Sequence, residues 1–550
     1  MSNSNSYSYS GNLNNTLLLL IASILLTSPV HGTTPYSDDI IQSSCITTLY
    51  PDLCYSTLST TKNLTTKKDV IQLAIEKTKE TIQGNFNALK KLSSDSNLHK
   101  RCKIALQECL ELVTGTLDDL DMVIQDLEEY PTKKSLREQA DDLKTLMSTT
   151  ITNEDICVDE LSYDDACKQY SKSIIERQDL GGKMCSNVLA MIKNMTDTDI
   201  AKSDKPELNV RNLKEEKWPE WLSRRDRKLF GLWGVKPNVI VSKDGKGNYT
   251  TVAEAVKAAP EKSKKRFLIK IAKGVYEENV EIPKTKTKLM FIGDGREKTI
   301  ITGKRNVAID NYTTWNSATV GIAGAKFLAR DITFRNTAGP SGHQAVALRV
   351  AADLSAFYRC SMVAYQDTLY VANGRQFFIN CIIIGTVDFI FGNAAVVFQF
   401  CDILAHLPNK KQKNMLTAQG RKDPNQNTGI VIQSCKLGAT PELKPVQKDF
   451  PTYLGRPWKN YSRTVIMTSS ISDVIKPEGW HIWKGDFALT TLYYREFRNV
   501  GKGADTSKRV NWTGWGVMKT KEEAVPFTVG NFINGWKWLM PIGFPFWPGW

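Results

Sequence analysis

The chain has 550 residues, of which 41% are apolar and 24% charged, and its formal net charge is +14. This length is too great for one ordinary hydrophobic core, and the composition excludes a disordered or fibrous chain. Residues 33–230 carry 28 Lys and Arg against 34 Asp and Glu, a net charge of −6, whereas residues 231–550 carry 44 against 24, a net charge of +20. The acidic first half and the basic second half therefore either dock together or meet different partners.

The first 32 residues contain no Lys, Arg, Asp or Glu and include the apolar stretch LLLLIASILL at 17–26. Ten apolar residues are too few to span a bilayer, which argues against a membrane anchor. Val30 and Gly32 lie at the small-residue positions of a cleavage site, although the basic residues usual at the start of a leader are missing. We interpret residues 1–32 as a signal peptide and expect a soluble, secreted mature chain.

Two further features are typical of secreted proteins. The eleven cysteines form no C-x-x-C pair, which favours disulfides over a zinc ribbon or a thioredoxin-type motif. The chain after residue 32 also carries six glycosylation sequons, at Asn63, Asn194, Asn248, Asn311, Asn460 and Asn511. We therefore expect a glycoprotein with disulfide bonds.

Residues 33–200 show the apolar spacing of amphipathic helices. In the segment 69–92, Ile71, Ile75, Ile82, Phe86 and Leu89 recur at intervals of three, four or seven. Similar spacing runs through 104–127 and 136–147, and strand-like runs are scarce. The pattern predicts an all-α four-helix bundle.

Residues 201–234 are polar and charged, and we interpret them as a linker. The segment WPEWLSRRDRKLFG ends it and holds the basic residues Arg224, Arg225, Arg227 and Lys228. An exposed basic cluster in a secreted chain is suited to proteolytic processing. A solvated run of charge accounts for the same residues equally well.

From residue 235 to 550, short runs of β-branched and aromatic residues alternate with Gly, Asn and Asp. The segments FYRC, FINC, FQFC and IQSC end at Cys360, Cys381, Cys401 and Cys435, and the first two intervals are 21 and 20 residues. A strand repeat of this length without helices predicts an all-β right-handed parallel β-helix with one coil per repeat. The amphipathic segment 251–259 is placed to cover its open end.

The repeat also predicts which cysteines are neighbours. Cys360 and Cys381 should stack on adjacent coils at a Cα separation that a disulfide accepts, whether or not they are oxidised. Cys401 and Cys435 flank a longer insertion, and we expect this pair to form a bridge.

The same register gathers four polar residues on one face. Asp388, inside CIIIGTVDFIFG, lies 21 residues after Asp367, and Gln366 lies 22 residues after Gln344. Each of them alone is better explained by a turn or a side-chain ladder, but two acids and two amides in one register favour a functional site.

Two neighbouring carboxyl groups in a partly apolar cleft cannot both ionise easily, which produces one anionic nucleophile and one acid. Glutamine amides can donate to an oxyanion. The sequence lacks G-x-S-x-G, H-E-x-x-H and Walker A motifs, and its five histidines form no evident cluster, so we expect no metal and no cofactor. Ester hydrolysis by carboxylates fits best, while a glycosidase also uses two acids.

Six segments resemble, in order, the signature blocks of plant pectin methylesterases: GVYEENV (274–280), ITFRNTAG (332–339), HQAVALRV (343–350), AYQDTLYV (364–371), GTVDFIFGNA (385–394) and YLGRPWKNYSRT (453–464). CLELVTGTLDDL (109–120) and TNEDICVDEL (152–161) resemble the pectin methylesterase inhibitor domain that precedes some of these enzymes. The resemblance implies a cell-wall enzyme that removes methyl groups from homogalacturonan. Its implied partners are that pectin, its own pro-domain or separate inhibitor proteins, and a processing protease, with neither nucleic acid nor membrane.

The resemblance also implies roles for individual residues. Asp388 would be the nucleophile, Asp367 the acid and then the base, and Gln366 the oxyanion donor. Arg456 would orient Asp388. Further substrate contacts are implied for Thr314, Gln344, Trp458, Tyr370 and Phe391.

In the helical half the resemblance implies two bridges, Cys45 with Cys54 and Cys109 with Cys157. Cys102, Cys167 and Cys185 are additional, so that either one more pair and a free thiol form or all three stay reduced. The processing motif RKLF (227–230) departs from the family's usual double leucine.

Two alternatives from other classes remain. The first is a secreted regulatory protein whose helical half inhibits other pectin methylesterases while the β-helix is a passive carrier. The second is a β-helical lyase or polygalacturonase. The intact acid pair with Arg456 argues against the first, and the amides beside the acids argue against the second.

Overall fold

The structure, a computed structural model, describes residues 36–61, 63–132, 135–203 and 236–549. The predicted signal peptide (1–32) and the basic residues Arg224, Arg225, Arg227 and Lys228 lie outside the described residues. In the described ranges, none of the helices is both long and apolar enough to cross a membrane.

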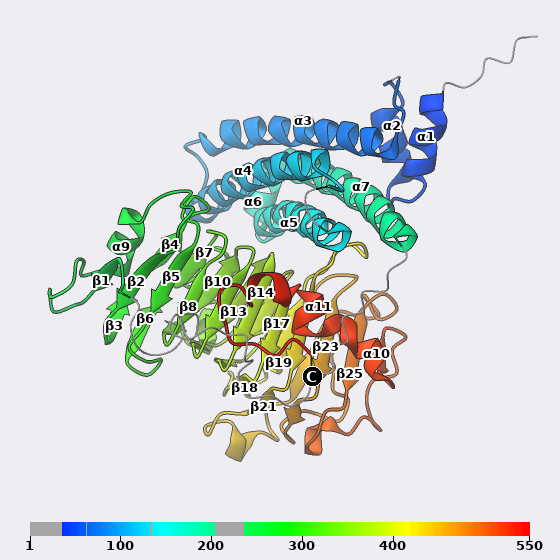
Figure 1. The fold of residues 1–550 in the computed structure, drawn as a ribbon. Helices are drawn as coiled ribbons and strands as arrows, with labels where there is room; N and C mark the ends of the chain where they lie inside the picture. Colours follow the sequence, from blue (N-terminus) through cyan, green and yellow to red (C-terminus); the bar gives the residue numbers. More distant parts are fainter. Residues whose placement is uncertain (1–35, 62, 133–134, 204–235, 550) are drawn as a thin grey trace, which may run out of the picture.

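The first part of the described chain is helical, as predicted. Four long helices pack side by side (Figure 1) and shorter ones flank them. The helices are α1 (Tyr36–Cys45), α2 (Pro51–Leu58), α3 (Lys67–Ser93), α4 (Lys100–Glu128), α5 (Leu136–Ser162), α6 (Asp165–Tyr170) and α7 (Lys172–Lys202). We call residues 36–203 the helical bundle.

The periodic apolar residues form the centre of this bundle. Ile71, Ile75, Ile82 and Leu89 on α3 are all fully buried. Helix α3 begins where Thr66 and Asp69 exchange hydrogen bonds in a capping box, which satisfies two backbone N–H groups of the first turn. The start of this helix is therefore determined by the local capping residues, and its buried face is determined by the 3.6-residue period of its apolar residues.

Disulfides staple the bundle. The two bridges implied by the resemblance, Cys45–Cys54 and Cys109–Cys157, are present. A third bridge joins Cys102 on α4 to Cys167 on α6 and closes a separation of 65 residues. Cys185 is a buried free thiol, which resolves the open question about the three additional cysteines.

The second part of the described chain, residues 236–549, is a parallel β-helix of three sheets (Figure 1). The seven-stranded sheet runs in the order β22 (Thr452–Gly455), β19 (Asn414–Gln419), β16 (Ile390–Gly392), β13 (Leu369–Asn373), β10 (Leu348–Ala351), β7 (Val320–Ile322) and β4 (Val280–Ile282).

The eleven-stranded sheet comprises β1 (Val239–Val241), β2 (Phe267–Ile271), β5 (Leu289–Ile292), β8 (Leu328–Arg330), β11 (Ser355–Tyr358), β14 (Arg375–Ile379), β17 (Ala395–Gln399), β20 (Gly429–Gln433), β23 (Arg463–Met467), β25 (Tyr493–Phe497) and β26 (Trp515–Val517). The eight-stranded sheet comprises β24 (Ser470–Ile471), β21 (Lys436–Ala439), β18 (Asp402–Ala405), β15 (Ile382–Gly385), β12 (Ser361–Val363), β9 (Thr333–Asn336), β6 (Thr299–Gly303) and β3 (Gly274–Glu277).

The predicted register is confirmed inside the coils. Phe357, Phe378 and Phe398 stack on successive coils, with ring centroids 4.5 and 4.9 Å apart. Ser361 pairs with Ile382, so the preceding Cys360 and Cys381 are neighbours, as expected. Each coil repeats about every 20 residues because equivalent side chains fill the same place in the core.

The predicted bridge between Cys401 and Cys435 is wrong in this structure, because both cysteines are buried free thiols. Each Sγ instead lies 3.2–3.5 Å from backbone carbonyl oxygens, those of Phe378 and Gln399 for Cys401 and those of Phe398 and Gln433 for Cys435. Each Sγ therefore lies between its own coil and the preceding one, and the two sulfur atoms are not joined.

Helices cover the exposed ends and faces of the β-helix. As expected, α9 (Val252–Ala258) packs against β1 and β4 at the first coil (Figure 1). The C-terminal helices α10 (Lys521–Ala524), α11 (Val529–Phe532) and α12 (Gly535–Trp538) belong to a segment that buries the outer face of the eleven-stranded sheet. The β-helix thus has a core built from its own residues.

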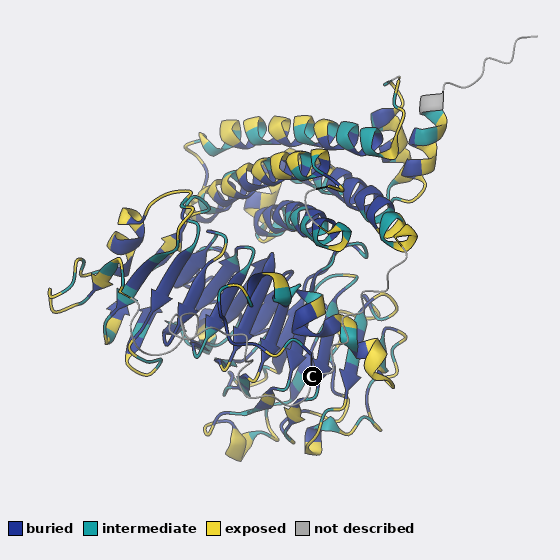
Figure 2. Ribbon diagram, viewed as in Figure 1, coloured by how far each residue is buried: buried dark blue, intermediate teal, exposed yellow. Residues whose placement is uncertain are grey.

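The helical bundle lies on the outer face of the seven-stranded sheet, with α5 nearest to it (Figures 1 and 2). Residues alternate along these strands: Leu369, Val371 and Ile390 point into the coil core, whereas Tyr370 and Phe391 belong to the apolar cluster of the bundle. One face of one sheet is therefore buried by the other half of the chain.

Candidate active site

The two carboxylates come together as the register predicted. Asp367 and Asp388 precede the paired strands β13 and β16, and the backbone N–H of Asp367 donates to the carbonyl of Val387 at 3.0 Å. Both aspartates have positive φ, 62° and 51°, which is a strained backbone conformation for a non-glycine residue. Other turns of the β-helix repeat this conformation on successive coils, for example at Arg359, Asn380 and Phe400, so it is a property of the coil turns.

Asp388 is held by an arginine. Arg456, directly after β22, donates from Nε to Oδ1 of Asp388 at 2.8 Å and from a terminal nitrogen to Oδ2 at 2.6 Å. This two-point contact with a permanently charged guanidinium fixes the position and orientation of the carboxylate. Asp388 is only 6% exposed. The sequence reasoning correctly placed Arg456 beside it.

Asp367 is electrostatically different from its neighbour. Burial raises the pKa of Asp367 well above its usual value, and the charge of Asp388 raises this pKa further, while Arg456 lowers it. No hydrogen bond from the described residues reaches its side chain. The pair therefore consists of an arginine-bound carboxyl group and a carboxyl group that burial makes harder to ionise, which is the division of roles that acid-assisted nucleophilic attack needs.

The two glutamines lie on neighbouring coils, and the backbone N–H of Ala345 donates to the carbonyl of Gln366 at 3.2 Å. Both side chains are half-buried. Oε1 of Gln344 is buried and has no hydrogen-bond partner. In the described part of the chain, neither side-chain amide donates a hydrogen bond to another residue, so both can donate to a bound group.

An aromatic wall runs beside the acids. Tyr370 stacks on Phe391 with ring centroids 4.2 Å apart, and Trp458 meets Phe391 at 6.0 Å. A Cβ at Gly420 would lie 2.7 Å from the Trp458 ring, so glycine there lets this ring approach the sheet. The three aromatic residues that we placed in the site are thus contiguous.

Sequence reasoning missed two tryptophans. Trp315 extends the wall, 5.9 Å from Tyr370, and the guanidinium of Arg349 lies 3.9 Å above its ring. Trp483 lies 4.5 Å from the guanidinium of Arg456 and is 38% exposed. Trp315 could have been found because it directly follows Thr314, but no repeat or spacing points to Trp483.

The helical bundle covers one end of this wall. Glu108 on α4 accepts hydrogen bonds from Thr313 and Asn316, and Glu160 on α5 accepts from the backbone N–H of Trp315 at 3.3 Å. Thr314, which we placed in the site, lies between these contacts and is half-buried. Burial raises the pKa of Glu160 to about 7.

The bundle also binds the other end of the wall through ion pairs. Lys459 lies 3.0 Å from Asp155 and 2.8 Å from Asp159, and Lys422 lies 2.9 Å from Asp155. Toward the first coils, Lys284 binds Asp119 at 2.7 Å. The acidic half thus docks onto the basic half, and it does so over the carboxylate pair.

The residues of the described ranges contain no group of three or more His, Cys, Asp or Glu side chains that could hold a metal ion. The chemistry available at the site is that of carboxyl, amide, guanidinium and aromatic groups. On a parallel β-helix, two neighbouring carboxyl groups with amide donors beside them are suited to hydrolysis by carboxylates.

Comparison with known proteins identifies the family. Residues 238–536 match the family model described as "Pectinesterase", and residues 39–191 match the model "Plant invertase/pectin methylesterase inhibitor". The chain therefore belongs to the pectinesterase family and carries an inhibitor-type domain in front of the enzyme domain.

Named relatives agree over most of the chain. "Pectinesterase 3" of Citrus sinensis is 57% identical over 514 residues, which cover 92% of this chain and 88% of the relative. "Pectinesterase/pectinesterase inhibitor U1" of Solanum lycopersicum is 54% identical over 558 residues and 96% of each chain. This protein is a pectinesterase and acts on pectin, as the resemblance implied. The interpretation as a lyase, a polygalacturonase or a passive carrier is not supported.

A solved structure matches the enzyme domain alone. The protein titled "Pectin methylesterase from Carrot" is 64% identical, with a TM-score of 0.57, and the match covers 58% of this chain and 99% of the carrot chain. A close relative thus folds as a β-helix without a helical bundle, in keeping with the self-contained core described above.

Proposed function

We propose that Asp388 is the nucleophile of a pectinesterase that demethylates homogalacturonan. The observation that supports this assignment is the unequal environment of the two acids, one bound by Arg456 and the other with a pKa raised by burial. An Oδ of Asp388 attacks the ester carbonyl carbon. The carbonyl oxygen becomes an oxyanion, to which the amide of Gln366 donates, with Gln344 assisting.

The intermediate collapses when the bond to the methoxy oxygen breaks and Asp367 gives its proton to that oxygen. Methanol leaves, and an anhydride joins the galacturonyl carbon to Asp388. Asp367, now a carboxylate, takes a proton from water, and the hydroxide adds to the galacturonyl carbon. Release of the acid restores anionic Asp388 and protonated Asp367, so one ester and one water become one carboxylic acid and one methanol.

The aromatic wall holds the sugar chain during these steps. Tyr370, Phe391 and Trp458 offer flat apolar surfaces to the faces of the sugar rings, and Thr314 and Gln344 offer polar contacts. Trp483 stacks on Arg456 and so limits the movement of the guanidinium that positions Asp388.

In the full chain the helical bundle blocks this surface. Tyr370 and Phe391 are 3% and 4% exposed, because they pack into the apolar cluster of the bundle. The polysaccharide cannot contact them until the bundle moves away. The bundle therefore acts in cis as an inhibitor, and cleavage in the linker at Arg224, Arg225, Arg227 and Lys228 releases a secreted enzyme into the cell wall.

Substitution of the acids tests the mechanism. In the β-helix domain, Asp388→Asn is nearly isosteric and should lower methanol release from methylated pectin by at least about 10³-fold. Asp367→Asn should be similarly severe, because protonation of the leaving group and activation of water both need it.

Asp402→Asn is the matched control, since Asp402 lies on β18 in the eight-stranded sheet, away from the acids. It should leave methanol release within about twofold. Circular dichroism checks that each variant is folded. Near-normal turnover by a folded Asp388→Asn domain would contradict the covalent mechanism.

Linker cleavage is tested separately. Changing Arg224, Arg225, Arg227 and Lys228 to Ala should leave an uncleaved, weakly active precursor. The size and specific activity of the secreted product are compared with those of the unchanged chain. If the altered chain is trimmed in this linker and equally active, processing at these residues is wrong, while the esterase mechanism stands.

A further inference from the structure

One histidine lies beside the carboxylate site and has no role in the proposed mechanism. His481 directly follows Trp480, whose backbone pairs with Gly455 at the end of β22. The backbone N–H of His481 donates to the carbonyl of Gly455 at 2.9 Å, and its ring meets the ring of Tyr453 edge to face, with centroids 4.8 Å apart. The imidazole is therefore held against the strand that leads to Arg456.

The contacts of the imidazole nitrogens define its neutral form. Nδ1 of His481 lies 2.7 Å from the carbonyl oxygen of Ile482, which can only accept, so Nδ1 carries a proton. Nε2 lies 3.1 Å from Nζ of Lys413, which can only donate, so Nε2 offers a lone pair. Both contacts are satisfied only when the imidazole is neutral.

Charged groups from three segments face this imidazole. Burial lowers the pKa of His481 below its ordinary value, and a backbone hydrogen bond opposes this shift. Lys413, before β19, and Arg456, after β22, lower the pKa further, whereas Asp388, before β16, raises it. A fourth titratable neighbour is Tyr453, whose ring contacts the imidazole. A second proton on Nε2 would stand against an ammonium and a guanidinium, so acid breaks the contact with Lys413.

The histidine is connected to the reacting group through two further residues. Trp483 lies two positions after His481, and the guanidinium of Arg456 is 4.5 Å from the centre of its ring. Arg456 in turn binds both oxygens of Asp388. The segment 482–486 is exposed, so few other contacts hold Trp483 over the guanidinium.

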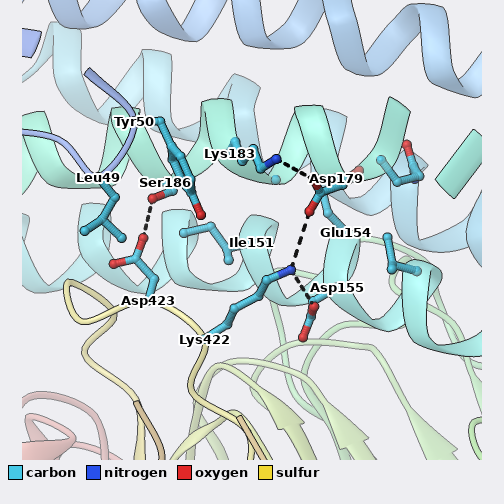
Figure 3. A pocket seen from close by; sticks show the side chains of 13 residues that line it. Leu49, Tyr50, Ile151, Glu154, Asp155, Asp179, Lys183, Ser186, Lys422 and Asp423 are labelled. Atoms are coloured by element: carbon cyan, nitrogen blue, oxygen red, sulfur yellow. Dashed lines mark hydrogen bonds and ion pairs between the residues drawn. The ribbon is translucent and has the colours of Figure 1, made fainter. Parts of the chain in front are cut away.

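This arrangement lies within the β-helix. Among the described residues, no hydrogen bond or ion pair joins residues 479–486 to the helical bundle. The bundle contacts the loop after β19 instead, where Lys422 points toward Asp155 and Asp179 (Figure 3). The contacts of His481 therefore do not require the bundle.

We propose that neutral His481 is a positioning residue, which holds Trp483 against Arg456 and so keeps the nucleophile oriented. When Nε2 gains a proton, the imidazolium repels Lys413 and Arg456, and the segment that carries Trp483 moves away from the guanidinium. Arg456 then gains freedom and Asp388 is less well aligned for attack, so turnover falls. This inference rests on the proposed esterase mechanism and adds a pH-sensitive support to it.

The experiment uses the β-helix domain, since a relative that consists of this domain folds alone. His481→Gln keeps an acceptor for the lysine but cannot take up a proton near neutral pH. Lys413→Met removes the cation that opposes the second proton, and Lys410→Met is the control, because it removes the same charge at an exposed position of the same loop.

For each protein, kcat and KM for methanol release from methylated pectin are measured between about pH 4.5 and pH 8, the range in which histidine titrates. The ionic strength is held constant. The titration of His481 is followed by NMR, and its signal is the one that is missing in His481→Gln.

In the unchanged domain, kcat should fall about fivefold as the pH drops through the pKa of His481, the effect of losing one cation–π contact, while KM should change by less than about twofold. This step should be absent in His481→Gln. In Lys413→Met, the step and the NMR titration should both move upward by about 0.5 to 1 pH unit. In Lys410→Met, both should move by less than about 0.2 pH unit. Protonation of the nucleophile also lowers kcat in acid, but that loss remains in every variant.

A step that survives unchanged in His481→Gln, or that stays in place in Lys413→Met, would overturn the inference. A merely structural role of the histidine would lower kcat by one factor at every pH and leave the shape of the profile unaltered. If His481→Gln does not fold, the comparison of Lys413→Met with Lys410→Met decides alone.

Failure of the proposed function is visible separately. If the unchanged domain releases no methanol at any pH, the esterase function is wrong, and the role of His481 falls with it. If methanol release is normal and the pH profile of Lys413→Met equals that of Lys410→Met, the function stands and the positioning role is wrong.

Discussion

Buried charged side chains find their partners in different places in the helical bundle and in the β-helix. In the β-helix, Arg509 and Glu496 pair with each other within the same domain, with Nε 3.0 Å from Oε1. In the bundle, Glu108 and Asp155 are buried by the β-helix and bind groups of that domain. A buried charge needs a partner. The buried pair of Arg509 and Glu496 therefore needs no partner from the bundle, whereas the buried Glu108 and Asp155 depend on the surface that the bundle covers.

The disulfide bonds also distinguish the helical bundle from the β-helix. The bundle has three disulfides, whereas the five free cysteines of the described chain include all four of the β-helix. The β-helix instead gains its stability from a continuous core in which each coil buries the next. The separable, inhibitor-like part is held by cross-links and the enzyme part by repetition, so conditions that damage one should spare the other.

The largest expected effect is the loss of methanol release when the ion pair between Arg456 and Asp388 is broken. If the site is complete within the β-helix, Arg456→Gln in the isolated domain should lower methanol release by about 10²–10³-fold, because the buried carboxylate of Asp388 loses its two-point partner. The measurement is kcat/KM on methylated pectin. Arg359→Gln, which breaks a partly exposed pair with Asp331, is the control and should cost less than about twofold. Equal effects of the two changes would contradict a self-contained site.

The second prediction, of a somewhat smaller effect, is that the helical bundle and the β-helix unfold independently of each other. Removing one disulfide with Cys102→Ala/Cys167→Ala should lower the free energy of unfolding of the bundle by about 2–4 kcal/mol, because this disulfide closes a loop with a sequence separation of 65 residues. Denaturant unfolding of the full chain should then show an earlier loss of helical signal and an unchanged midpoint for the β-helix. A matching shift of both midpoints would show that the domains unfold as one unit.

The smallest effect concerns the contact between the domains. Burial raises the pKa of Glu160 to about 7 and the pKa of Asp119 to about 6, and both residues bind the β-helix. When the domains separate, these carboxyl groups regain water and ordinary values. The contribution of their raised pKa values to association is therefore complete below the ordinary values, about 4, and is lost as the pH rises through about 6 to 7.

The affinity of a separately made bundle for the β-helix should thus fall about tenfold between pH 5 and pH 8, measured by calorimetry. Glu160→Gln/Asp119→Asn should flatten this dependence. Asp121→Asn should leave it unchanged, because Asp121 binds Lys79 within the bundle. Tighter binding at pH 8 than at pH 5 would contradict the assignment.

Much of this molecule follows from local pattern. The 3.6-residue spacing on α3 predicts its buried face because a helix must hide one stripe. The 21-residue interval places Asp367 beside Asp388 because parallel coils convert a fixed interval in sequence into adjacency in space. The pairing of Asp388 with Arg456 could be predicted from the resemblance of LGRPW to a pectin methylesterase motif, but not from the repeat.

Other features depend on the folded structure. The repeat correctly makes Cys401 and Cys435 neighbours, yet the direction of each Sγ depends on the packing inside the coil, and the thiols do not join. Trp483 reaches Arg456 from a loop that no spacing singles out. Side-chain direction and loop course arise from contacts that a one-dimensional pattern does not contain.

The sequence by itself determined the two halves, their opposite charges and the acid pair, because composition, period and repeat are local properties of the chain. Only the tertiary structure decided that the bundle lies over Tyr370 and Phe391 and that Asp155 meets Lys422 and Lys459. These contacts join residues about 220 to 300 positions apart, and net charge favours docking without choosing a face. The choice is made by the fit of an apolar face and its carboxylates to one sheet, which exists only after both halves have folded.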